Sequence, residues 1–140
     1  MVDAAVVQRK LAQLDTYLQQ IREFSSIALH EYQGDWKVQR IVERTLQIMI
    51  ETSVDIANHI ISDQGMRSPT SYADTFQILK ENSIITETLH VSLNKMAKFR
   101  NIVVHQYEGV DAGIVLTILK NHLMDFDRFR DAVIEYLARV

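Results

Sequence analysis

Residues 36–63 have the sequence WKVQRIVERTLQIMIETSVDIANHIISD, and the spacing of its apolar residues decides the fold. Apolar side chains recur there every three or four positions, which is the period of one helix face. The members of this stripe are Val38, Ile41, Val42, Leu46, Met49, Ile56 and Ile60. Asp35 stands before the stretch and suits a helix N-cap, because a carboxylate accepts hydrogen bonds from exposed first-turn N–H groups. Gly65 follows it and is a candidate for the left-handed residue that closes a helix. The stretch therefore predicts one long amphipathic helix.

Comparable patterns lie on both sides of this helix. Residues 4–32 carry an apolar seam with alternating spacings of four and three, and Gly34 ends it. A short helix is predicted over about 70–81, and a longer one follows over about 85–107. A last helix is predicted from Asp111, a second candidate N-cap, to about residue 138. Its stripe consists of Val115, Leu119, Phe126, Phe129 and Val133.

The composition agrees with an all-helical protein. The chain has 140 residues with one proline, four glycines and no cysteine, so residues that break helices are scarce. No stretch alternates apolar and polar residues with period two over a useful length, which argues against a sheet. We therefore predict an all-α fold, an antiparallel bundle of about five helices that forms a single domain over residues 1–140.

Two absences predict where the protein acts. The N-terminal residues lack a basic region followed by an apolar run, so no signal peptide is expected. No run of about 18 apolar residues is free of charge, so neither a membrane span nor a membrane partner is expected. The lack of cysteine excludes disulfides and thiolate zinc sites, and together these features predict a cytoplasmic protein.

The formal net charge of −3 argues against a protein that coats nucleic acid through many phosphate contacts. An enzyme that only cuts nucleic acid needs positive charge at one place. The segment from Thr88 to Tyr107 contains no Asp or Glu but holds Lys95, Lys98 and Arg100. The predicted fourth helix is thus a candidate for such a local positive site.

Arg100 interrupts the apolar stripe of this helix. The stripe consists of Leu89, Leu93, Met96, Val103 and Tyr107, and Arg100 fills the missing place in the series. Such an arginine either packs its stem on the bundle with its head in water, or meets an anion at a helix or subunit interface. His105 lies five residues on, about 140° around the helix, whereas Asn101 and His105 share a face. A site using these residues must wrap around the helix edge, be helped by fraying of the helix near Gly109, or be completed by a second copy of the helix.

Phe99-Arg100-Asn101-Ile102-Val103-Val104-His105-Gln106-Tyr107 resembles the signature of the HEPN superfamily, in particular of its HepT-like toxin branch. That signature is an arginine followed by a polar residue, a histidine four to six residues after the arginine, and a tyrosine two further on. Residues 42–47 and 55–60 are similar to the branch's second helix. Residues 69–74, with Phe76 and Leu79, are similar to its short third helix. The resemblance covers residues 35–137.

The resemblance implies a toxin of a toxin–antitoxin pair, acting as a metal-independent endoribonuclease without a cofactor. It also implies a homodimer in which the two motifs meet at the interface. The expected partners are the RNA substrate and a minimal nucleotidyltransferase antitoxin that transfers AMP to the motif tyrosine, Tyr107. The chemistry follows from the residue types, because RNA carries its own nucleophile in the 2′-hydroxyl. The imidazole of His105 can act as an acid or a base near neutral pH. Arg100 stabilises the charge on the phosphate, and Asn101 orients the phosphate or the imidazole.

Other residues allow further interpretations. Glu51, Asp55 and His59 fall at i, i+4 and i+8 and could in principle hold a metal, although a solvated helix face with local pairing is the favoured interpretation. Basic residues that could guide RNA, or simply form exposed charged faces, are Lys37, Arg40, Arg44, Lys95 and Lys98. His122 lies in an apolar stripe and is expected in the core or at an interface. The alternative function is a non-catalytic helical module that binds nucleotide or docks beside a nucleotidyltransferase.

Overall fold

The computed structural model describes residues 3–106 and 108–140. In chain order the elements are α1 (Ala4–Ile21), a 3₁₀ turn η1 (Arg22–Phe24), α2 (Leu29–Gln33), α3 (Trp36–Asp63), α4 (Tyr72–Glu81), α5 (Glu87–His105), α6 (Ala112–Asn121) and α7 (Met124–Arg139). The described residues contain no strand, and the all-α prediction is confirmed.

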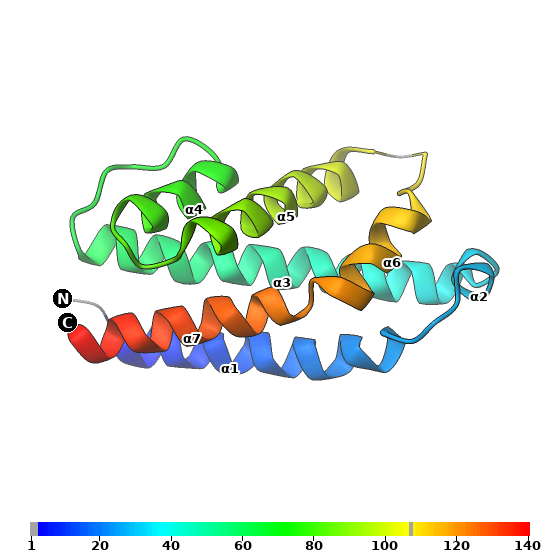
Figure 1. Cartoon of the computed structure of the whole chain (residues 1–140), viewed down its shortest axis with the longest axis horizontal. Helices are drawn as coiled ribbons and strands as arrows, with labels where there is room; N and C mark the ends of the chain where they lie inside the picture. The colour runs from blue at the N-terminus through cyan, green and yellow to red at the C-terminus, as the bar shows by residue number, and fades with distance from the viewer. Residues whose placement is uncertain (1–2, 107) are drawn as a thin grey trace.

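Four long helices form the body of the molecule. Helix α1 packs against α3, α3 against α5, α5 against α7, and α7 back against α1, so that the four close into a ring. Successive members of this ring run in opposite directions (Figure 1), as expected for an antiparallel bundle. Helix α4 covers α3 and α5, while α2 and α6 pack together at one end. The fold thereby presents α3, α4 and α5 on one side of the bundle.

The predicted helix boundaries rest on caps that the structure contains. The carboxylate of Asp35 accepts hydrogen bonds from the N–H groups of Lys37 and Val38, each at 3.1 Å, at the start of α3. The Asp111 carboxylate likewise accepts from the N–H of Gly113 at 2.7 Å at the start of α6. Gly65 has φ of +65°, a conformation that costs glycine little because it has no Cβ. The predictions for Asp35, Asp111 and Gly65 are confirmed.

The number of helices differs from the predicted five, because two predicted helices are each broken once. The stretch 4–32 leaves the α-helix after Ile21, passes through η1, and becomes extended at Ala28 with ψ of 152°. The stretch after Asp111 breaks at His122, between α6 and α7. The break is held by the buried Asp125, whose carboxylate lies 3.1 Å from the His122 ring. The described residues therefore form seven α-helices, since apolar spacing continues through both breaks and does not reveal them.

The core is continuous and lies between the long helices. Its largest fully buried side chains are Tyr32, Phe76, Phe126, Phe129, Leu14, Leu18, Ile21, Leu46, Met49, Ile50, Ile56 and Ile60. Phe76 of α4 and Phe129 of α7 meet edge to face with ring centroids 6.1 Å apart, which ties the covering helix to the ring. Across the described part of the chain, no helix is both long enough and apolar enough to span a membrane. This packing fixes α3 and α5, the two helices that carry the candidate site.

Candidate active site

Arg100 lies on the face of α5 that packs towards α3 and α4, and its side chain is 20% exposed. Its Nε donates a hydrogen bond to Oε1 of Glu51 on α3 at 3.2 Å. Its Nη1 donates to Oδ1 of Asn101 at 3.3 Å, and its Cζ lies 4.6 Å from the centre of the Tyr72 ring. The arginine in the apolar stripe is therefore fixed by a carboxylate, an amide and an aromatic face of the same chain.

Glu51 is itself held in place from α3. Gln47, one turn earlier on the same helix, donates from Nε2 to the Oε1 of Glu51 at 3.0 Å. The Oε1 atom thus receives hydrogen bonds from both Gln47 and Arg100. The carboxylate of Glu51 therefore lies at the Nε edge of the guanidinium, and the opposite edge of the guanidinium faces away from Glu51.

The guanidinium keeps unused donors. An arginine has five N–H bonds, and in the described residues Arg100 uses one at Nε and one at Nη1, which leaves three on its two Nη atoms. An arginine with two free Nη atoms offers the forked geometry that binds phosphate oxygens. The site therefore presents a preoriented cation with spare donors.

Tyr72 reaches Arg100 because it is the first residue of α4. The hydroxyl of Ser71 caps this helix by accepting from the N–H of Asp74 at 3.0 Å. A guanidinium within about 6 Å of an aromatic ring centre is attracted by the negative face of the ring. Tyr72 thus contributes a flat, half-buried surface against which the plane of Arg100 is set.

Asn101 and His105 complete the described part of the motif. Both are exposed, and His105 is the last residue of α5. No hydrogen bond joins His105 to Arg100 in the described part of the chain, in agreement with their separation around the helix. One chain therefore brings Arg100 and Asn101 into contact and leaves His105 on the face of Asn101, away from Arg100.

Tyr107, the predicted modification site, lies outside the described residues. Helix α5 ends at His105, and Gln106 is already extended with ψ of 109°. The predicted helix end, at about residue 107, therefore lies two residues beyond the observed one, and the prediction that Tyr107 is on the Arg100 face falls outside the described residues. The chain leaves the helical path just before the tyrosine.

The predicted alternative of a metal on α3 finds no support. Glu51 is paired with Arg100, and Asp55 accepts a hydrogen bond from Lys10 at 2.8 Å. Among the described residues, no group of three or more His, Cys, Asp or Glu side chains is placed to hold a metal. Glu51 and Asp55 instead pair with side chains of the neighbouring helices α5 and α1.

His122 is not a core residue. It lies at the end of α6 with its side chain 38% exposed and its Nδ1 3.1 Å from Asp125. The apolar stripe suggested burial because the break between α6 and α7 leaves the spacing unchanged. His122 is part of the network that holds this turn.

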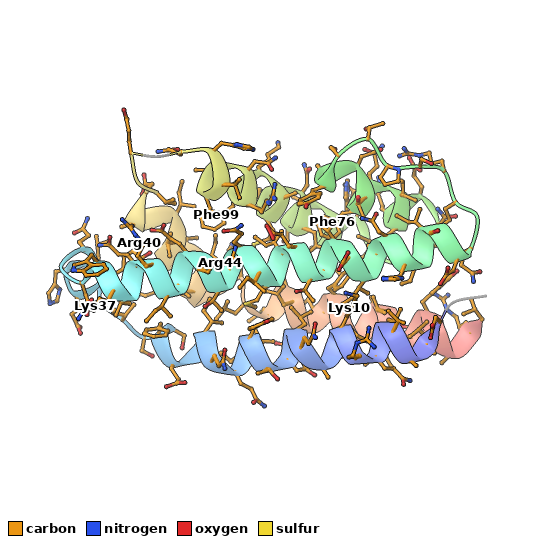
Figure 2. All side chains as sticks on the ribbon, turned by 180° about the vertical axis from the view of Figure 1, so that it is seen from behind. Lys10, Lys37, Arg40, Arg44, Phe76 and Phe99 are labelled. Atoms are coloured by element: carbon orange, nitrogen blue, oxygen red, sulfur yellow. The ribbon has the colours of Figure 1, made fainter. Side chains whose placement is uncertain are left out.

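The predicted basic residues fall into two groups. Lys37, Arg40 and Arg44 are exposed along α3 (Figure 2), on the helix face that continues to Glu51. Lys95 and Lys98 are exposed on α5, where Lys98 and His105, seven residues apart, share a face turned away from Arg100. The first group therefore shares a helix face with Glu51, the partner of Arg100, and Lys98 of the second group shares a face with His105.

Sequence reasoning missed two partners of Arg100. It considered Glu51 as a metal ligand or as part of a solvated face, and it considered Tyr72 only as part of the resemblance of residues 69–74 to the family's third helix. The signal that could have found Glu51 is the arginine itself, because a cation in an apolar stripe needs a counter-charge on the helix packed against it.

Comparisons with known proteins give a consistent result. A family model described as ribonuclease HepT-like matches residues 14–133. The mRNA nuclease HepT of Shewanella oneidensis is 38% identical over 103 residues, covering 74% of this chain and 77% of the relative. The tRNA nuclease HepT of Aphanizomenon flos-aquae is 26% identical over 138 residues, covering 97% of this chain and 92% of the relative. A solved structure, the tri-AMPylated Shewanella oneidensis HEPN toxin in complex with an MNT antitoxin, superposes with a TM-score of 0.86. It is 32% identical and the match covers 96% of this chain and 99% of that one.

Proposed function

The chain belongs to the ribonuclease HepT-like family, and from that premise we propose that it is the toxin endoribonuclease of a toxin–antitoxin pair. The proposed substrate is RNA, which the names of two relatives, an mRNA nuclease and a tRNA nuclease, support. The observation that carries the proposal is Arg100, a guanidinium fixed on one edge by Glu51 and Tyr72 with three N–H donors unspent.

The proposed reaction uses the substrate's own nucleophile. His105 takes the proton from the 2′-hydroxyl, the 2′-oxygen attacks the adjacent phosphorus, and the bond to the 5′-oxygen breaks. An acid, the histidine of a second copy, returns a proton to the departing 5′-oxygen. Arg100 donates to the phosphate oxygens as charge builds on them, and Asn101 helps orient the phosphate. The products are a 2′,3′-cyclic phosphate and a 5′-hydroxyl, and no step calls for a metal ion.

A homodimer supplies what one chain lacks. Arg100 and His105 lie about 140° apart around α5, so a second copy of the motif is the simplest way to face both groups towards one phosphate. We expect light scattering to give twice the 16.2 kDa mass of the chain at micromolar concentration. A stable monomer that still cuts RNA would contradict the dimeric site.

The proposed partner is a nucleotidyltransferase antitoxin that transfers AMP to Tyr107. The support is the solved relative, an AMPylated toxin in complex with its antitoxin, which matches almost the whole chain. The basic residues Lys37, Arg40, Arg44, Lys95 and Lys98 are proposed to guide the RNA, as five exposed cations on an acidic protein.

The direct test of the function is a gel of total RNA incubated with the wild-type protein or with His105→Ala. Fragments with wild type and intact RNA with His105→Ala are expected. Intact RNA in both lanes, with the wild-type protein free of modification by mass, would favour the alternative of a non-catalytic docking module.

Glu51 is proposed as a positioning residue for Arg100. Removing its carboxylate in Glu51→Ala frees the Nε edge, and we expect kcat to fall about 10- to 100-fold, the cost of a misplaced catalytic group, while KM changes little. Glu51→Gln keeps an acceptor oxygen and should recover most of the loss. The exposed Glu31→Ala serves as the matched control. Equal melting temperatures with an unchanged kcat in Glu51→Ala would refute the role.

A further inference from the structure

A polar groove lies beside Arg100, between α1, α3 and α4. Its volume is about 460 Å³, within the range of sites that hold small ligands. Its lining consists of Lys10, Gln13, Tyr17, Arg44, Ile48, Glu51, Thr52, Asp55 and Tyr72. Glu51 and Tyr72 both line this groove and hold the Arg100 guanidinium, so the groove is continuous with the candidate active site.

The groove offers one uncommitted cation. Lys10 is paired with Asp55 at 2.8 Å, whereas Arg44 has no carboxylate within 4.0 Å in the described part of the chain, and its side chain is exposed. Arg44 lies seven residues before Glu51, two helical turns or about 10 Å along α3, on the same face. Figure 2 shows Arg44 and Lys10 on the two helices that bound the groove. Arg44 thus supplies a second guanidinium, on the groove that adjoins Arg100.

The walls of the groove suit a nucleobase. Tyr17 and Tyr72 are both half-buried, so each exposes part of a ring to the groove. Tyrosine rings stack on any base, since every base has a π-face. Gln13, Thr52 and the Lys10–Asp55 pair supply donors and acceptors at the groove wall. An aromatic wall, a polar wall and a free cation are the components of a nucleotide subsite.

We propose that this groove binds the nucleotide adjacent to the scissile phosphate, with Arg44 on its phosphate and Tyr17 against its base. The inference rests on the proposed RNA cleavage and adds to it the path of the substrate across α3 and α1. The carboxylate of Asp55 only accepts hydrogen bonds, so it suits a donor on the base, either the amino group of adenine, cytosine or guanine or the N3–H of uracil.

Binding without cleavage tests the groove separately from the nuclease. The full-length His105→Ala protein is titrated into fluorescein-labelled single-stranded oligoadenylate, oligocytidylate or oligouridylate, and anisotropy is followed at several salt concentrations. Adding Arg44→Gln should weaken binding about tenfold and reduce the slope of log K against log salt by about 0.7, the value for one lost phosphate contact. Tyr17→Leu should weaken binding about 5- to 100-fold at any salt, whereas Tyr17→Phe, which keeps the ring, should restore it.

Controls and outcomes separate the two proposals. Arg9→Gln removes an exposed α1 cation outside the groove and should bind as the parent does. In the wild-type background, Arg44→Gln should raise KM about tenfold with little change in kcat. The proposed role of the groove is overturned if Arg44→Gln and Tyr17→Leu bind RNA as tightly as the His105→Ala parent does. It is also overturned if the parent does not bind RNA. If the variants lose binding as expected but the wild-type protein never cleaves RNA, the proposed nuclease activity is overturned and the proposed binding role of the groove is retained.

Discussion

Arg100→Ala is expected to reduce RNA cleavage at least about 100- to 1000-fold, the effect of losing a donor that stabilises developing charge in a transition state. The structure gives the reason, because Arg100 is the guanidinium that Glu51 and Tyr72 orient and whose Nη atoms keep free N–H donors. His105→Ala should have a comparable effect through the loss of acid–base catalysis. Initial rates on a defined RNA, measured in EDTA, are the readout, and wild-type activity should persist there.

Arg100→Lys is the sharper variant of this prediction. It keeps the charge but loses the planar fork, so it should remain far below wild type if the fork matters. Arg128→Ala, which removes an arginine on α7 that pairs with Asp125, is the control for loss of a positive charge. Each variant must keep its helical circular dichroism. Full dependence of wild-type cleavage on a divalent metal ion would reject the mechanism.

The fold was largely predictable because each long helix carries its own apolar stripe. The bounds of α3 were predicted to the residue from Asp35 and Gly65, both of which act as local signals. The breaks after Ile21 and at His122 were not predictable in the same way. Each depends on interactions, such as that of His122 with Asp125, that leave the apolar spacing intact.

The candidate site was predictable only in part. Arg100 and Asn101 are a local motif, and their contact follows from adjacency on α5. Glu51 and Tyr72 come from α3 and α4, and no spacing along the chain relates them to Arg100. The position of His105 relative to Arg100 follows from helical geometry, whereas the group that faces it depends on a second copy. Contacts between helices are set by packing, which one sequence does not specify.

Tyr107→Phe is expected to produce a toxin that its antitoxin cannot silence by modification. Coexpression of the wild-type chain with a cognate nucleotidyltransferase should raise its mass by one or more AMP units on Tyr107 and stop RNA cleavage. The physical reason is charge and position, since each AMP adds a phosphate that competes for the same guanidinium as the substrate phosphate. Tyr107→Phe should keep the wild-type melting temperature and cleavage rate, and its mass should stay unchanged after coexpression.

The matched variant Tyr136→Phe on α7 should still be modified and silenced. If modified and unmodified proteins cut RNA at the same rate, AMP on Tyr107 does not regulate this nuclease, and inhibition must come from binding of the antitoxin alone.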